Sequence, residues 1–346
     1  MIPRALAGVR VLDLTRLLPG AYATLLLADL GADVVKIEDP RGGDSMRTLG
    51  PLASGRRAYF EALNRGKRSV TLDLRAPEAA RVLDALAARA DVIVDSFRPS
   101  TARRLGVDAA TLRARHPRLV CASISGFGPD GPYAERAAHD INYQALAGLL
   151  KPPSLPGPLI GDIGAAMQTA IGVLAALLDR ERTGEGASVD VAIHDAARAW
   201  SMFPTTDDLF SACYAIYETA DGQWLALGAL EPKFWTGFCE RIGRPDLAPR
   251  QHAIGGERRR VLEEVRAAMR GRTRDEWLAR FADADVCLTT VYTPDEAQSD
   301  PHVAARHGGE PGHRAAPDLG ADTDAVLEDA GVGAETRARL RASRVI

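Results

Sequence analysis

Residues 9–14, VRVLDL, and residues 33–38, DVVKIE, are two short apolar runs separated by the helix-like segment 21–30, AYATLLLADL. The alternation continues with expected strands at 69–73, 91–95 and 119–123 and expected helices at 77–90 and within 101–115. Strands that alternate with helices predict a parallel sheet covered by helices on both faces. The sequence therefore predicts an α/β fold.

A β-rich region begins near Ser211. Two expected strands, 214–218 and 223–227, flank the turn at 220–222, ADG, which is a hairpin signal. Amphipathic helices and one more strand follow. Because 346 residues are too many for one ordinary core, we expect two domains. The large domain is placed over 1–205, completed by 301–346, and a small α+β domain over 206–300.

Composition limits the possible partners. With 26% charged residues, 46% hydrophobic residues and a net charge of −3, the chain gives no reason to expect nucleic acid. The N-terminus, MIPRA, lacks the regions of a signal peptide, and the uncharged stretch 165–178 of the expected helix 161–182 is too short to span a bilayer. We therefore expect a cytoplasmic protein with no membrane partner. The four cysteines are scattered singly, so we interpret them as reduced packing residues and expect no metal site.

Ligands of open α/β sheets bind beyond the carboxyl ends of the strands. At these ends the chain reads TRLLPG at 15–20, RPS at 98–100 and GFGPDGP at 126–132. We expect functional residues in these loops.

Three residues at expected helix starts could carry chemistry. His139 precedes Asp140, which could cap that helix, and the exposed amides there favour an anionic oxygen; alone, His139 could be a surface residue. Asp162 is flanked by glycines and Glu231 precedes Pro232, so either carboxylate could be only a cap. Together the three offer a near-neutral base, an acid and an orienting group for moving a proton.

The sequence resembles the family III CoA-transferases, and among them the α-methylacyl-CoA racemases, almost from end to end. The shared motifs are GVRVLD (8–13), LLPG (17–20), LGADVVKIE (30–38), NRGKRS (64–69), SFRP (96–99), SGFG (125–128), HDINY (139–143), GD (161–162) and GALEP (228–232). In transferases of this family the aspartate that matches Asp162 is a nucleophile, and an aromatic residue usually matches His139. In the racemases that position is histidine, and a glutamate that matches Glu231 supports it.

The resemblance implies the family III CoA-transferase fold, with a Rossmann-like large domain and a smaller α+β domain in an interlocked homodimer. In such a dimer His139 and Asp162 of one chain meet Glu231 of the other. An acyl-CoA thioester is the implied substrate, with coenzyme A as part of it and no prosthetic group. The implied CoA and substrate contacts are Leu17, Leu72, Asp73, Leu74, Arg75, Ser96, Phe97, Arg98, Arg104, Ala138, Asp140, Ile141, Asn142 and Tyr143.

The racemase-type residues favour proton transfer at the α carbon of a 2-methylacyl-CoA through an enolate, with His139 and Asp162 on opposite faces. One alternative is CoA transfer between carboxylic acids with Asp162 as nucleophile. Another is an inactive protein that binds CoA thioesters.

The chain departs from the racemases in two ways. The segments 139–162 and 190–214 are shorter than usual, which affects the expected size of the acyl pocket. Asp39 stands where many relatives have an arginine that contacts the CoA nucleotide. Lys36 and Arg41 are the cations that could replace it.

Overall fold

The computed structural model describes residues 4–53, 55–202, 211–307 and 314–346. The chain divides into two compact units, residues 1–202 with 312–346 and residues 203–311. The expected domain boundary at 205–206 lies outside the described residues. The expected return to the large domain at residue 301 stays a prediction.

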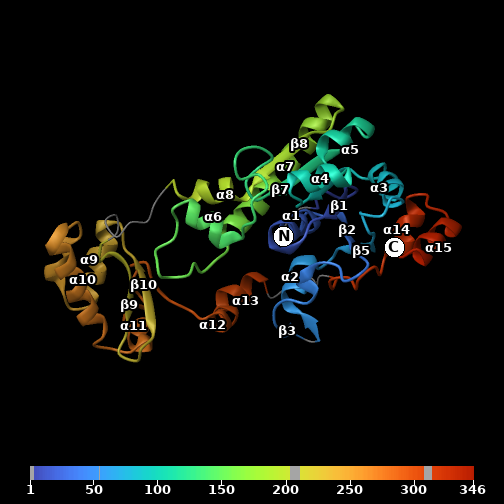
Figure 1. Ribbon diagram of the computed structural model, residues 1–346. Coiled ribbons are helices and arrows are strands. Elements are labelled where there is room, and N and C mark those ends of the chain that lie inside the picture. The colour runs from blue at the N-terminus through green and yellow to red at the C-terminus, as the bar shows by residue number, and fades with distance from the viewer. Residues whose placement is uncertain (1–3, 54, 203–210, 308–313) are drawn as a thin grey trace. The chain divides into compact units, whose positions relative to one another are not determined.

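A six-stranded sheet forms the centre of the first unit, in the order β5-β2-β1-β6-β7-β8 (Figure 1). Every pairing between neighbouring strands is parallel, which confirms the predicted sheet. Its strands are β1 (Arg10–Leu14), β2 (Asp33–Glu38), β5 (Arg68–Thr71), β6 (Val92–Asp95), β7 (Val120–Ser125) and β8 (Ser188–Ala192).

Helices cover both faces of this sheet because successive side chains of a strand point to opposite sides. In β1, Leu12 and Leu14 enter one core cluster and Val11 enters the other. The first face is covered by α3 (Ala79–Ala87), α4 (Pro99–Leu105), α5 (Ala109–Arg115), α14 (Thr323–Asp329) and α15 (Ala334–Ala342). The other face is covered by α1 (Leu17–Asp29), α6 (Asp140–Leu146), α7 (Ile160–Thr183) and α8 (Ile193–Trp200).

Four short elements between β2 and β5 were not predicted. They are η1 (Ser45–Arg47), the strands β3 (Leu52–Ala53) and β4 (Arg56–Arg57), and α2 (Ala58–Asn64). Phe60 and Leu63 of α2 pack with Ala21 and Met46 in a small separate cluster. Elements this short carry too little periodicity to be read from the sequence.

The helix α1 begins at Leu17 and not at Ala21, where the sequence placed its start. Leu17 has a positive φ of 61°, so the chain turns sharply into the helix at a residue type that rarely adopts this conformation. Gly20 is required in the first turn, because a Cβ there would lie 2.2 Å from Cβ of Thr15. The loop after β1 therefore consists of only Thr15 and Arg16.

The helix α7 is long and apolar enough, by length and composition, to cross a membrane. The expectation of no membrane span rests on the uncharged stretch 165–178 alone, which is too short to span a bilayer. Half of the most apolar part of α7 is buried inside the first unit, where Ala165, Ala166 and Val173 are fully buried against the sheet. This burial is typical of the core helix of an α/β unit.

The second unit is built on a small antiparallel sheet in the order β11-β10-β9. The predicted hairpin is confirmed, with Trp224 paired to Glu218. The strands are β9 (Tyr214–Glu218), β10 (Trp224–Gly228) and β11 (Leu288–Thr290). The helices are α9 (Pro232–Arg241), η2 (Pro245–Arg250), α10 (Gly255–Met269), α11 (Arg274–Phe281), α12 (Pro294–Gln298) and α13 (Pro301–His307).

Candidate active site

The strand order reverses at β1. The chain places β2 and β5 on one side of β1, and then β6, β7 and β8 on the other side. The loops that follow β1 and β6 meet at this point, where the backbone N–H of Arg16 donates to Oγ of Ser96 at 3.0 Å. In open α/β sheets such a reversal leaves a crevice beyond the carboxyl ends of the strands, which is the usual place for a ligand.

Two cavities open along this edge. The first, about 270 Å³, is lined by the ends of β1, β2 and β5 and by α4, and includes Asp39, Asp73 and Arg104. The second, about 550 Å³, is lined by residues that follow β6 and β7 and by the starts of α6 and α7, and includes His139 and Asp162. Arg16, Phe97 and Thr101 line both cavities, so the two adjoin each other at these residues.

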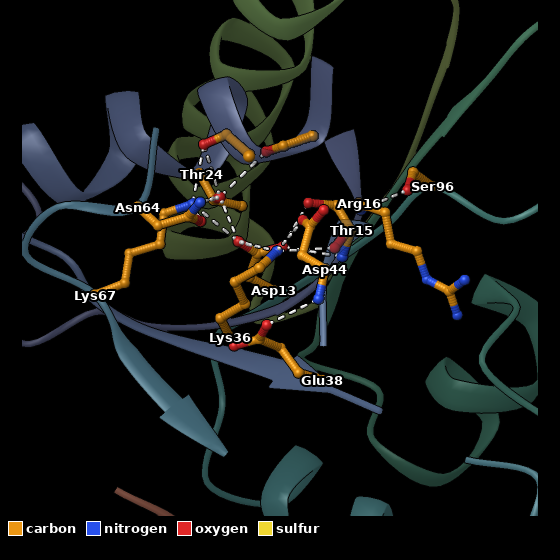
Figure 2. Close-up of polar contacts among 12 residues, drawn as sticks. Asp13, Thr15, Arg16, Thr24, Lys36, Glu38, Asp44, Asn64, Lys67 and Ser96 are labelled. Carbon is orange, nitrogen blue, oxygen red and sulfur yellow. Dashed lines mark hydrogen bonds and ion pairs between the residues drawn. The ribbon is translucent and has the colours of Figure 1, made fainter. Parts of the chain in front are cut away.

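A buried lysine cluster, made of Asp13, Lys36, Asp44 and Lys67, lies beneath the loop after β1 (Figure 2). Nζ of Lys36 lies 3.0 Å from Oδ2 of Asp44, and Nζ of Lys67 lies 3.1 Å from Oδ2 of Asp13. All four side chains are almost completely buried. Burial alone would raise the pKa of Asp13, but the charges of Lys36 and Lys67 together with hydrogen bonds from Thr15 and Thr24 lower that pKa overall.

The burial of Lys36 in this cluster bears on which cation could replace the arginine that many relatives have at the position of Asp39. Lys36 has no exposed side-chain surface, so it does not reach a ligand in the first cavity. Arg41 is exposed and is held by two aspartates, with Nε 2.9 Å from Oδ1 of Asp39 and Nη2 3.0 Å from Oδ2 of Asp73. Arg41 lines neither cavity, whereas Arg75 lines the first and has its Nη2 2.8 Å from Oδ2 of Asp39.

Asp162 lies in the first turn of α7, and its carboxylate belongs to the wall of the second cavity. Its backbone N–H donates to Oδ1 of Asp140 at 2.9 Å. Asp140, expected to cap its own helix, instead satisfies an amide at the start of α7. Gly161 permits this approach, because a Cβ there would lie 3.0 Å from the Asp140 carboxylate. Burial, and secondly the charge of Asp140, raise the pKa of Asp162 to about 7.

This raised pKa makes a prediction about stability. An unfolded aspartate ionises near pH ~3.9, so between there and pH 7 only the unfolded chain loses the Asp162 proton, and stability falls as the pH rises. We expect Asp162→Asn, which keeps the shape and removes the charge, to stabilise the protein more at pH 8 than at pH 5, by about 1 to 3 kcal/mol.

Urea unfolding at the two pH values, at a fixed protein concentration, measures this difference. Asp130→Asn, at an exposed aspartate of the loop after β7, is the matched control and should change stability by less than ~0.5 kcal/mol at both. An equal effect of Asp162→Asn at both pH values would show that Asp162 ionises like an exposed carboxylate.

His139 is the N-cap residue of α6 and lines the second cavity. Oδ1 of Asn142 accepts from its backbone N–H at 3.0 Å, and its carbonyl accepts from the N–H of Asn142 at 2.8 Å. These two bonds fix the backbone from which the imidazole extends. Tyr143 is buried one turn further on, and burial, followed by the charge of Asp162, raises its pKa to about 12. Tyr143 therefore stays a neutral hydroxyl in the cavity wall.

Glu231 belongs to the second unit, where it is the N-cap residue of α9. Its side chain is exposed and makes no capping hydrogen bond, so the capping alternative does not hold. The turn before it is fixed by the buried Gln251, whose Nε2 donates to the carbonyls of Ala229 at 3.2 Å and Leu230 at 2.8 Å. The backbone that leads into Glu231 is therefore held in place, while its carboxylate is exposed.

The expected CoA and substrate contacts separate into three groups. The first cavity holds Leu72, Asp73, Leu74, Arg75, Phe97 and Arg104. The second holds Leu17, Ser96, Phe97 again, Arg98, Ala138 and Tyr143, together with the expected catalytic residues His139 and Asp162. Asp140, Ile141 and Asn142 line neither, because Asp140 is buried against α7 while the other two are exposed on α6.

The sequence missed Arg16 and Arg136 as residues of these cavities. Arg16 stands in a loop that the sequence had marked, directly after β1, and its position at a strand end is the signal that could have found it. Among the described residues no group of three or more His, Cys, Asp or Glu side chains is placed to hold a metal ion.

Residues 6–316 match the family model described as CoA-transferase family III. The chain belongs to this family. A solved structure of Rv3272 from M. tuberculosis superposes on this chain with a TM-score of 0.80 at 30% identity, over 94% of this chain and 99% of that one. The predicted family III fold is thereby confirmed.

Relatives in family III include both transferases and racemases. The chain is 36% identical to succinyl-CoA–D-citramalate CoA-transferase of Chloroflexus aurantiacus, over 88% of this chain and 82% of that protein. It is 30% identical to α-methylacyl-CoA racemase of Homo sapiens, over 99% of this chain and 97% of that protein. The protein is thus an enzyme of the family III transferase and racemase superfamily, whose members act on CoA thioesters.

Proposed function

We propose that this protein is a racemase of 2-methylacyl-CoA thioesters. The observation that carries the proposal is the pairing of His139, at the start of α6, with the largely buried Asp162 in the wall of one cavity. A base and an acid in one cavity are what removal and return of an α-proton require. The match to the human racemase over almost the whole of both chains supports the same assignment.

The proposed reaction moves one proton at each face of the α carbon. Neutral His139 takes the α-proton, and the electrons of the broken C–H bond pass into the thioester as an enolate. Protonated Asp162 then gives its proton to the opposite face, which leaves an imidazolium and a carboxylate. The pKa of about 7 provides both forms of Asp162 near neutral pH, so the reaction can run in either direction.

The enolate oxygen needs hydrogen-bond donors, because the α-proton of a thioester is far less acidic than either side chain. We assign this role to the backbone N–H groups of Asp140 and Ile141, the first two residues of α6, which directly follow His139 in the wall of the second cavity. Glu231 of the partner subunit is proposed to orient and polarise His139.

The proposal includes the homodimer that the resemblance implies. The outer face of α7 supports it, since Met167, Ile171 and Leu178 expose 45%, 64% and 65% of their surface at helical spacing. An apolar stripe of this length on a helix is typical of a surface that another chain covers.

The deciding experiment incubates the enzyme with a panel of 2-methylacyl-CoAs in heavy water and follows deuterium at the α carbon by mass spectrometry. We expect exchange together with inversion of configuration. A protein that binds CoA yet shows neither exchange nor transfer would be the inactive binding protein.

CoA transfer is the second candidate, because the relative from Chloroflexus aurantiacus is a transferase at 36% identity. In that reaction the Asp162 carboxylate attacks the thioester carbonyl, CoA leaves as the thiolate, and an acyl anhydride remains on Asp162. A parallel incubation with acyl-CoA and a free carboxylic acid tests it. Efficient exchange of CoA between the acids, with hydroxylamine converting the Asp162 side chain of the acylated enzyme to a hydroxamate as the acyl group leaves as its carboxylate, would replace the racemase assignment.

A further inference from the structure

Arg16 stands where the two cavities adjoin. Four other arginines belong to one cavity each, since Arg75 and Arg104 line only the first and Arg98 and Arg136 line only the second. Arg16 lines both. A ligand that extends from one cavity into the other must therefore pass this side chain.

The Arg16 side chain is exposed and available to a ligand. Within the described part of the chain the Arg16 guanidinium forms no hydrogen bond and no ion pair. The Cζ atom of Arg16 lies 5.9 Å from the ring centroid of Phe97. Figure 2 shows the side chain extending away from the buried lysine cluster. Phe97 gives the guanidinium an apolar surface on one side and leaves its N–H groups for an acceptor.

The backbone of Arg16 is held firmly on both sides. Nζ of Lys36 donates to the carbonyl of Thr15 at 2.9 Å, and the N–H of Leu17 donates to Oδ1 of Asp44 at 3.3 Å. The N–H of Arg16 itself is bound by Ser96. Because Lys36 and Asp44 are buried, moving this loop would break hydrogen bonds that water cannot replace, one from the Lys36 ammonium and one to the Asp44 carboxylate. The loop is therefore a rigid base for a single projecting cation.

We propose that Arg16 binds the diphosphate of coenzyme A. The inference rests on the proposed function in so far as the ligand is a CoA thioester. His139 and Asp162 require the thioester end in the second cavity, so the nucleotide end extends toward the first. The diphosphate joins these two parts of CoA, and so it comes to the junction where Arg16 stands. A planar guanidinium can grip phosphate oxygens at two points.

The test measures dissociation constants by calorimetry, with no dependence on the reaction. The ligands are CoA, dephospho-CoA, which keeps the diphosphate and lacks the 3′-phosphate, and pantetheine, which has no phosphate. We expect Arg16→Ala to weaken CoA and dephospho-CoA by the same factor, about 10- to 100-fold, and to leave pantetheine unchanged. Arg16→Lys should recover part of the loss, because a point charge replaces the planar fork.

Arg103→Ala is the matched control, since Arg103 is an exposed arginine of α4 that lines neither cavity. It should change the affinity for CoA less than ~2-fold. A loss for CoA but not for dephospho-CoA would place Arg16 at the 3′-phosphate and overturn the assignment. An equal loss for pantetheine would overturn it in favour of a structural role. Wild-type protein that binds neither CoA nor dephospho-CoA would overturn the proposed function, and this assignment with it.

Discussion

In a His139→Ala variant, racemisation should fall at least ~10²-fold, the usual cost of losing a general acid or base, while deuterium exchange should be lost from only one enantiomer of the substrate. The reason is that each group serves one face of the α carbon. Without His139, Asp162 can still remove a proton from its own face and return a deuteron there, so that enantiomer exchanges without inverting.

Asp162→Asn should give the mirror-image result, with exchange retained for the other enantiomer alone. In the His139→Ala variant the surviving exchange depends on ionised Asp162, so it should rise as the pH passes through about 7. Mass spectrometry of each pure enantiomer in heavy water, with chiral analysis of the product, measures both quantities. His252→Ala, at an exposed histidine of the second unit, is the control and should behave like wild type. Equal loss for both enantiomers in either variant would contradict the assignment of one group to each face.

The fold was predictable because its signal is local. Strands such as β2 and β9 were placed to the residue, since both have clear strand patterns bounded by turn residues. The start of α1 was misplaced for an equally local reason. Its first turn contains Pro19 and Gly20, which are poor helix formers, and a leucine with positive φ. Tertiary contacts with Asp44 and Thr15 hold that turn, and the sequence does not display them.

The site was predictable as far as motifs reach. His139 and Asp162 were found from the motifs HDINY and GD, and the structure brings both to one cavity. From the sequence, Lys36 is a possible contact of the CoA nucleotide. In the structure its ammonium group pairs with Asp44 and Asp13 inside the core. Nothing in a strand sequence shows that a lysine will meet partners from other segments. Arg16 was missed for the converse reason, because its importance depends on two cavities adjoining, which is a property of the folded sheet.

The proposed sharing of the site between two subunits gives the last prediction. If His139 and Asp162 of one subunit meet Glu231 of the partner subunit, a heterodimer of His139→Ala and Glu231→Gln chains contains one intact site and one site with both changes. Neither homodimer contains an intact site. The chains must be co-expressed with different affinity tags, because interlocked dimers should not exchange subunits after folding.

Tandem purification of the heterodimer should recover about half the wild-type racemisation rate, if the two sites act independently. Each parental homodimer supplies a baseline, and a heterodimer of His139→Ala with Asp162→Asn chains is the matched control. Those two residues belong to the same unit of one chain, so every site in the control carries one of the changes and activity should stay at the parental level. Should the first heterodimer show only the average of its parents, Glu231 acts within its own chain or not at all. The three residues would then form no shared site, and the orienting group of His139 would have to come from within its own subunit.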